Sequence, residues 1–445
     1  MWQSVGLTLQ RRVRRHDAPP AVTLSGRHTA RPAPGATRRP MSTSTHARGA
    51  AVPRAAATIG GLPRRKAMAF LSLFFVPAVA QAILLTVVPL EALQLLGDAR
   101  ALTLLYVSAG LVAVAGRFCI PFLVRLIKRR FVFTLGALSM AVSATLMAAD
   151  WLPAFALGVA LSILAFGCVE IASQLYLLDN VPRHALRHFE PVRIFASAGP
   201  WTLGPWLGVY LQHGIGFAAP FAITMTASVA VVALFWSLRL GENAVITSTR
   251  RPPPSPARYL RRFFAQPRLR LAWTLAVARS AWWNMFFVYT PIFAVTSGLG
   301  AETGGVIVSI GSAWMWLVPL WGWAGRRYGL RRLLIAGYAM TGVLSLCAAL
   351  VFHIPWLGAV MILLAAFGTE TIDGAGNLLF LRAVHAHERP EMTTVFASSR
   401  DVAQLGPPVV FSLLLSVFSL SSVFIASGAM MLASAVLSRH IPRRL

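Results

Sequence analysis

The chain has 445 residues, of which 56% are hydrophobic and only 12% are charged. A soluble domain carries about 25% charged residues, so this composition excludes an ordinary soluble protein and indicates a membrane protein. The 41 Lys and Arg residues outnumber the 14 Asp and Glu residues, which leaves a formal charge of +27.

Residues 1–66 form a basic leader that contains Asp17 as its one acid. The leader is rich in Pro, Ala, Ser and Thr and has no apolar run long enough to pack, so we predict a disordered basic tail. No short apolar segment with a cleavage site precedes the first long apolar run, which argues against a signal peptide. Met41 opens a shorter leader, and the sequence leaves open whether residues 1–40 are translated.

From residue 67 onward the sequence contains twelve apolar stretches long enough to cross a bilayer, which takes about 20 helical residues. The runs are continuous rather than alternating, so we expect helices and not a β-barrel. The predicted spans are residues 68–93, 101–124, 131–149, 153–178, 193–212, 216–238, 271–296, 304–324, 332–352, 356–381, 396–417 and 420–438. The sequence therefore predicts an all-α membrane protein.

The loops between these spans alternate in charge. The loops on one side are rich in arginine, whereas the loops on the other side contain a single basic residue, Arg100. Basic loops stay in the cytoplasm, so we predict that both termini are cytoplasmic and that the chain lies in the plasma (inner) membrane. The basic loops are residues 125–130, 182–193, 239–270, 325–332 and 382–400, together with the C-terminus.

An internal repeat has a period near 200 residues. Phe166-Gly167 in the fourth span recurs as Phe367-Gly368 in the tenth. Arg193 followed by Gly199-Pro200 recurs as Arg400 followed by Gly406-Pro407. We therefore predict two bundles of six helices, residues 67–239 and 271–445, joined by a cytoplasmic linker, residues 240–270.

The loop between spans 8 and 9 carries Gly322, Arg327 and Gly329, and the matching loop of the first half keeps Arg129 and Arg130. This pattern resembles the loop signature of the major facilitator superfamily, although both halves carry arginine where that signature has aspartate. The resemblance implies twelve transmembrane helices in two pseudo-symmetric bundles that work by alternating access. It also implies that helices 1, 4, 7 and 10 line a central cavity.

Glycine, proline and arginine mark the positions where we expect bending or gating. Gly204-Pro205-x-x-Gly208 in span 5 resembles a glycine–proline signature of proton-coupled exporters, because glycine allows close helix contact and proline removes a backbone hydrogen bond. Ordinary helix packing is the alternative for these positions. The expected gating residues are Arg193, Gly199, Pro200, Gly204, Pro205, Gly208, Gly322, Arg327, Gly329, Arg400, Gly406 and Pro407.

Polar side chains within the spans are costly in lipid unless they face a cavity or a partner, so each is a candidate binding residue. Glu370, Asp373 and Asn377 lie within about 60° of one another on the tenth span. An acid among Glu170, Glu370 and Asp373 is expected to carry a coupled proton, while Arg279 pairs with it or binds an anion. A static ion pair is the alternative. The candidates are Gln81, Glu170, Gln174, Arg279, Trp283, Glu370, Asp373 and Asn377, whereas we interpret most other tryptophans, Trp321 among them, as anchors or packing residues.

Enzyme motifs and metal-ligand spacings are missing from the sequence, so we predict no catalysis and no cofactor. We predict a monomeric secondary transporter of a small organic solute, coupled to protons, and we favour an exporter. An uptake symporter for an organic anion stays open because of Arg279. A membrane sensor on the same fold stays open too, although the linker is too short and irregular for an ordered domain. Anionic lipid explains the basic tail more simply than nucleic acid does.

Overall fold

The computed structural model describes residues 58–59, 62–181, 183–237, 256–375, 378–384 and 389–442. Most of the predicted basic tail, residues 1–57, therefore lies outside the described residues, as does Asn377. Two short strands, β1 (Thr58–Ile59) and β2 (Leu62–Pro63), form an antiparallel pair before the first helix. The elements that follow are helices.

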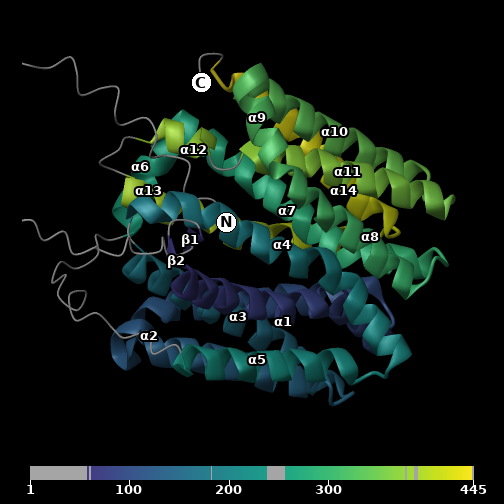
Figure 1. Ribbon diagram of the computed structural model, residues 1–445. Coiled ribbons are helices and arrows are strands. Elements are labelled where there is room, and N and C mark those ends of the chain that lie inside the picture. The colour runs from purple at the N-terminus through teal and green to yellow at the C-terminus, as the bar shows by residue number, and fades with distance from the viewer. Residues whose placement is uncertain are drawn as a thin grey trace, which may run out of the picture.

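The first half of the chain contains five helices that cover the first six predicted spans (Figure 1). Span 1 lies in α1, spans 2 and 3 both lie in α2, and spans 4, 5 and 6 lie in α3, α4 and α5. The helices are α1 (Arg64–Leu96), α2 (Ala99–Met147), α3 (Leu152–Asn180), α4 (Arg183–Gly214) and α5 (Ala219–Ser237).

Helical geometry continues through the expected loop at residues 125–130, so α2 has 49 residues. The helix nevertheless turns back on itself. Gly116 packs against Leu164, and Gly136 packs against Cys168, one turn further along α3. A straight helix would separate residues 20 positions apart by about 30 Å. The helix therefore reverses direction between Gly116 and Gly136, as two separate spans require.

The second half contains the remaining six spans. Span 8 is divided by a 3₁₀ turn, η2 (Trp314–Leu317), and the described residues of span 10 lie in α11 and α12. Its helices are α7 (Pro267–Thr296), α8 (Ala301–Ala313), α9 (Val318–Tyr328), α10 (Leu330–Leu350), α11 (Pro355–Ala375), α12 (Leu378–Ala383), α13 (Arg389–Leu415) and α14 (Ser421–Leu437), and a 3₁₀ turn, η3 (Ser438–His440), follows.

The linker predicted at residues 240–270 contains ordered structure that the sequence interpretation missed. Helix α6 occupies Pro256–Ala265, and α7 begins at Pro267. Within the described residues, nine helical segments are long and apolar enough to cross a membrane by length and composition. The helices α4, α7 and α13 are also long enough, but they are more polar.

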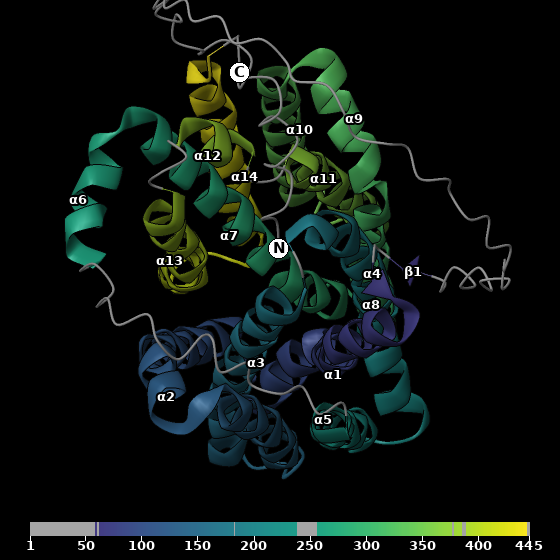
Figure 2. The same ribbon diagram turned by 60° about the vertical axis from the view of Figure 1, so that its left-hand side comes forward.

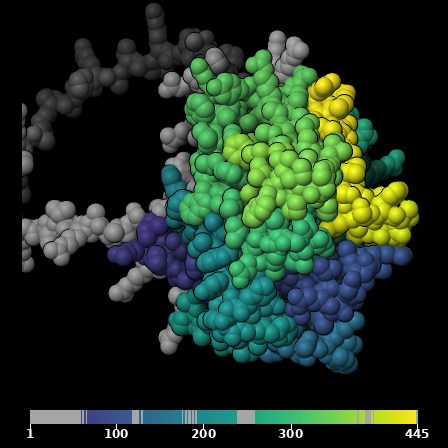
Figure 3. All heavy atoms as spheres, turned by 90° about the vertical axis from the view of Figure 1, so that its right-hand side faces the viewer, coloured from purple at the N-terminus to yellow at the C-terminus, as the bar shows by residue number. Residues whose placement is uncertain are grey.

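The two halves pack side by side, with the first half below the second in Figure 1. The pairs α1–α7, α2–α13 and α4–α8 form the interface between them. We call the end that carries loops 125–130 and 325–332 the basic end, and the other the opposite end. From the side facing the viewer in Figure 3, the two halves meet without an open channel between them.

Contacts along α4 show how closely the halves meet. The Trp206 backbone N–H donates a hydrogen bond to Ser309 Oγ of α8 at 2.9 Å. Nearer the basic end, the Phe195 and Trp316 rings meet edge to face at 4.4 Å. At the opposite end, the Thr103 and Tyr289 hydroxyls are 2.7 Å apart and join α2 to α7. The halves are therefore in contact towards both ends of the bundle.

Candidate functional site

An ion pair between α7 and α11 forms the centre of the candidate site. Arg279 Nη1 lies 3.0 Å from Asp373 Oδ1. The Trp283 indole N–H donates a hydrogen bond to Asp373 Oδ2 at 2.7 Å. Arg279 and Trp283 are one helical turn apart, so both reach the same carboxylate from one face of α7. Both oxygens of Asp373 thus have partners, and the pair is largely buried, with 12% and 20% of the two side chains exposed.

Glu370 lies one turn before Asp373 on α11 and is only 5% exposed. Its Oε2 atom has no hydrogen-bond partner among the described residues. Glu370 interacts electrostatically with two charged side chains, Asp373 and Arg279. The structure therefore brings four predicted residues into one cluster, in which Asp373 is fully paired and Glu370 is not.

Trp321 of α9, which the sequence interpretation assigned to anchoring or packing, packs on the part of α11 that carries Glu370. Its Cβ contacts Gly374, one turn after Glu370, and its ring meets Phe367, one turn before, at 5.0 Å. The Trp321 indole therefore lies along the part of α11 that carries Glu370. Its Nε1 atom is buried without a partner in the part of the chain that the structure describes. No sequence signal marks this residue, because α9 and α11 meet only through the fold.

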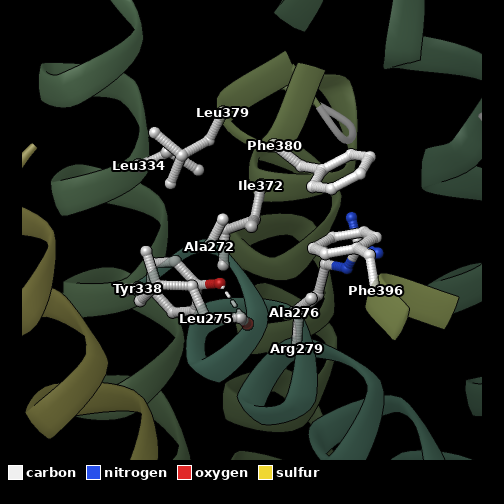
Figure 4. A pocket seen from close by; sticks show the side chains of 10 residues that line it. All are labelled: Ala272, Leu275, Ala276, Arg279, Leu334, Tyr338, Ile372, Leu379, Phe380 and Phe396. Carbon is white, nitrogen blue, oxygen red and sulfur yellow. Dashed lines mark hydrogen bonds between the residues drawn. The ribbon is translucent and has the colours of Figure 1, made fainter. Parts of the chain in front are cut away.

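A small cavity of about 30 Å³ lies beside the ion pair. Figure 4 shows Arg279 at its edge, with the guanidinium group overlapped by the Phe396 ring in this view and the Phe380 ring above that of Phe396. Those two rings stack at 4.2 Å. The Tyr338 hydroxyl donates a hydrogen bond to the Leu275 carbonyl at 2.6 Å. The cavity has room for water but not for an organic solute.

Aromatic side chains connect this cluster to the first half. The Trp283 and Phe287 rings stack at 5.4 Å, and the Phe287 ring lies 6.2 Å from that of Trp201 on α4. Trp282 instead points into the second half, where its indole N–H donates to Ser345 Oγ at 2.9 Å. The two adjacent tryptophans therefore differ: Trp283 belongs to the site, and Trp282 packs α7 against α10.

Glu170 pairs with Arg400 and not with Arg279, which the sequence analysis named as a possible partner. Glu170 Oε1 of α3 lies 3.9 Å from Arg400 Nη1 of α13, and both side chains are about half exposed. Gln81 of α1 has a buried Oε1 atom without a partner in the described ranges, and Gln174 of α3 is partly buried. The first-half candidates thus do not join the Arg279 cluster through any described hydrogen bond or ion pair.

Two of the expected gating glycines lie where helices nearly touch. A Cβ at Gly204 would collide with Ala82 of α1, and one at Gly208 would collide with the Ile83 backbone. On the other face of α4, Gly305 of α8 packs against the backbone of Pro205 and Trp206. Helix α4 is therefore clamped between α1 and α8, one from each half.

The other expected gating residues have varied surroundings. Arg193 is buried, with its guanidinium carbon 4.4 Å from the centre of the Phe74 ring of α1. Gly329 ends α9 at φ +90°, a backbone conformation that glycine adopts without strain. A Cβ at Gly199 or Gly406 would meet open space. Pro200, Gly322, Arg327 and Pro407 lie within α4, α9 and α13.

Glu91 is a buried acid that the sequence interpretation overlooked. Glu91 lies near the C-terminal end of α1 and is 4% exposed. It accepts a hydrogen bond from Gln212 Nε2 of α4 at 3.0 Å. The rule applied to the other spans would have found it, because it is the one acid between residues 68 and 93. Among the described residues, no group of three or more His, Cys, Asp and Glu could hold a metal ion.

The family model of the Major Facilitator Superfamily matches residues 69–318 and 313–444, which together span most of the chain. The chain belongs to this superfamily. A comparison with curated proteins finds no match.

Solved structures of transporters share the superfamily fold with this chain. A mutant of a peptide transporter POT, in complex with sulfate, has a TM-score of 0.69 at 13% identity, and the match covers 87% of this chain and 96% of that one. The nucleoside transporter NupG has a TM-score of 0.66 at 14% identity, with 84% and 98% covered. A D-xylose-proton symporter has a TM-score of 0.67 at 12% identity, with 85% and 98% covered. At this identity the likeness establishes the fold.

Proposed function

We propose that the chain is a secondary active transporter that moves a small organic solute across the plasma (inner) membrane by alternating access, coupled to protons. Membership of the Major Facilitator Superfamily supports the transport class. The observation that carries the proposal is the buried cluster of Arg279, Asp373, Trp283 and Glu370. Charged side chains within transmembrane helices are energetically costly, and they typically mark the path of an ion or a solute.

Glu370 is the proposed proton carrier. Asp373 already has a cation on one oxygen and an indole N–H on the other, so a proton would have to displace one of them. The Oε2 atom of Glu370 is buried and has no hydrogen-bond donor in the described part of the chain. Glu370 also interacts electrostatically with Arg279. A proton on Glu370 would remove the charge of a buried carboxylate that no donor among the described residues stabilises, and its loss would let Arg279 turn from Asp373 towards Glu370.

The direction of transport rests on a different segment. The glycine–proline segment of α4 is clamped between α1 of one half and α8 of the other, which suits a helix that must slide or bend between states. This supports the exporter. The basic end would face the cytoplasm by the positive-inside rule.

Uptake of an organic anion is the second candidate. Arg279 could hold an anion only after Asp373 releases it, so protonation of Asp373 would be the coupled step in that mechanism. The Trp283, Phe287 and Trp201 rings favour a solute with a flat apolar part in either case. A membrane sensor on the same fold would carry no solute flux at all.

The test uses the full chain in proteoliposomes that contain a pH-sensitive dye. A panel of organic cations, anions and neutral solutes is added while internal pH and solute uptake are followed. We expect solute-dependent proton movement, which Glu370→Gln abolishes while exchange of solute against solute persists. Glu302→Gln is the control, because that acid lies at the opposite end with 60% of its side chain exposed. Proton coupling that survives in Glu370→Gln would remove Glu370 from the mechanism, and absence of any flux would favour the sensor.

A further inference from the structure

Helix α6 has two faces of opposite character. At 100° per residue, Tyr259, Leu260, Phe263 and Phe264 occupy a sector of about 140°. Arg261 projects from the other side of the helix. This division is typical of a helix that lies at a membrane surface.

The aromatic face holds α6 on the protein. Phe263 is fully buried, and its ring lies 6.4 Å from that of Phe380 in α12. The Phe264 ring meets Trp273 of α7 edge to face at 5.2 Å. Figure 2 shows α6 at the rim of the molecule, outside α12 and α13. The helix is therefore fixed in place with its remaining surface directed away from the bundle.

The outward surface combines positive charge with one exposed apolar side chain. Arg261 of α6 and both Arg268 and Arg270 of α7 are exposed. Leu260 is also 47% exposed, although it lies within the apolar sector of α6. The sequence has no Asp or Glu between residues 243 and 301, so no acid from this stretch neutralises these arginines.

The position of these residues places them at the depth of the lipid headgroups. The apolar part of α7 begins directly after Arg270, at residue 271. Helix α6 ends at Ala265, one residue before α7 begins at Pro267. Arg268 and Arg270 are therefore within three residues of the hydrocarbon boundary, and Arg261 lies on the adjoining helix α6 at the rim of the molecule.

We propose that α6 and the first turn of α7 form a binding surface for acidic phospholipids, with Arg261, Arg268 and Arg270 on the headgroups and Leu260 at the edge of the hydrocarbon. Each arginine near an anionic membrane surface strengthens binding roughly fivefold. This proposal does not depend on the transported solute or on the coupled ion.

A chain of aromatic contacts links this surface to the cavity beside Arg279. Phe263 contacts Phe380, and Phe380 stacks on Phe396. Phe380 and Phe396 both line that cavity. Acidic lipid that holds α6 in place therefore braces one wall of the candidate site, and it stabilises the folded chain by mass action.

The experiment measures lipid binding to the purified full chain by native mass spectrometry, with phosphatidylglycerol or phosphatidylcholine added to the detergent. We expect the native chain to prefer phosphatidylglycerol. The triple variant Arg261→Gln, Arg268→Gln, Arg270→Gln should lose affinity for that lipid on the order of a hundredfold. Phosphatidylglycerol should also raise the unfolding temperature of the native chain and leave that of the variant unchanged.

Two controls separate charge from structure. The triple lysine variant at the same positions keeps the charge and should keep the preference, and Arg100→Gln removes an exposed arginine at the opposite end and should change nothing. Equal affinity of the native chain for both lipids, or a glutamine variant that binds like the native chain, would overturn the proposal. Displacement of the lipid by inorganic phosphate alone would assign the surface to soluble phosphate and overturn it too.

Discussion

Glu170 of α3 and Arg400 of α13 form an ion pair across the two halves of the chain, with 3.9 Å between Oε1 and Nη1. The sequence assigned these residues to different tasks, proton binding for Glu170 and gating for Arg400. Their side chains are 43% and 51% exposed. The pair thus belongs to the contacts that hold the halves together in this conformation, in a setting where water screens the charges.

A double-mutant cycle tests how strongly this pair couples the halves. We expect a coupling energy of about 1 kcal/mol or less between Glu170→Gln and Arg400→Gln, because exposed ion pairs contribute little. Chemical unfolding in detergent of the native chain, the two single variants and the double variant gives the value. A coupling of about 3 kcal/mol or more would show that the pair is dry and locks the conformation.

The Arg279–Asp373 pair should behave differently because it is largely buried. Asp373→Asn leaves a buried guanidinium without its counter-ion, which we expect to cost about 3–5 kcal/mol in the free energy of unfolding. Adding Arg279→Gln to Asp373→Asn should recover much of that loss, since no charge is then left unpaired. The same unfolding measurement checks both variants. A double variant less stable than Asp373→Asn would contradict the pairing.

Trp283 and Trp282 provide a matched comparison, because each indole N–H donates one hydrogen bond. Trp283→Phe removes a bond to the Asp373 carboxylate, and we expect a loss of about 1.5–3 kcal/mol, typical of bonds to charged groups. Trp282→Phe removes a bond to the Ser345 hydroxyl, for which about 0.5–1.5 kcal/mol is typical. Unfolding curves for the two variants, measured together, give the order. The reverse order would contradict the prediction that the bond to the charged carboxylate is the stronger one.

Gly208 should not tolerate alanine. The added Cβ would collide with the Ile83 backbone of α1, and we expect this overpacking to cost about 1–3 kcal/mol. Gly199 on the same helix faces open space, so Gly199→Ala should be neutral or stabilise the helix by up to about 1 kcal/mol. Melting temperatures in detergent distinguish the two outcomes. Equal effects at both positions would show that close helix contact is not what Gly208 provides.

Much of the architecture can be predicted from the sequence, because lipid imposes a simple rule on it. A span needs about 20 apolar residues with every backbone group bonded within the segment, so long apolar runs predict helices, and the twelve predicted spans fall in helices of the structure. The repeat of Arg193 and Arg400 with their Gly-Pro partners predicts the two halves. The order in α6 escaped this reasoning, because the linker was interpreted from its prolines and not from the aromatic residues that pack it on α7 and α12.

The sequence by itself placed Arg279, Trp283, Glu370 and Asp373 within predicted spans, and so it named them before any contact was known. Only the tertiary structure decided how they pair: Asp373 pairs with both Arg279 and Trp283, and Glu170 pairs with Arg400. Glu370 Oε2 has no donor among the described residues. The physical reason is that helical periodicity fixes the face of each helix on which a side chain lies. Which helices meet, and at what depth, depends on packing between segments far apart in the chain.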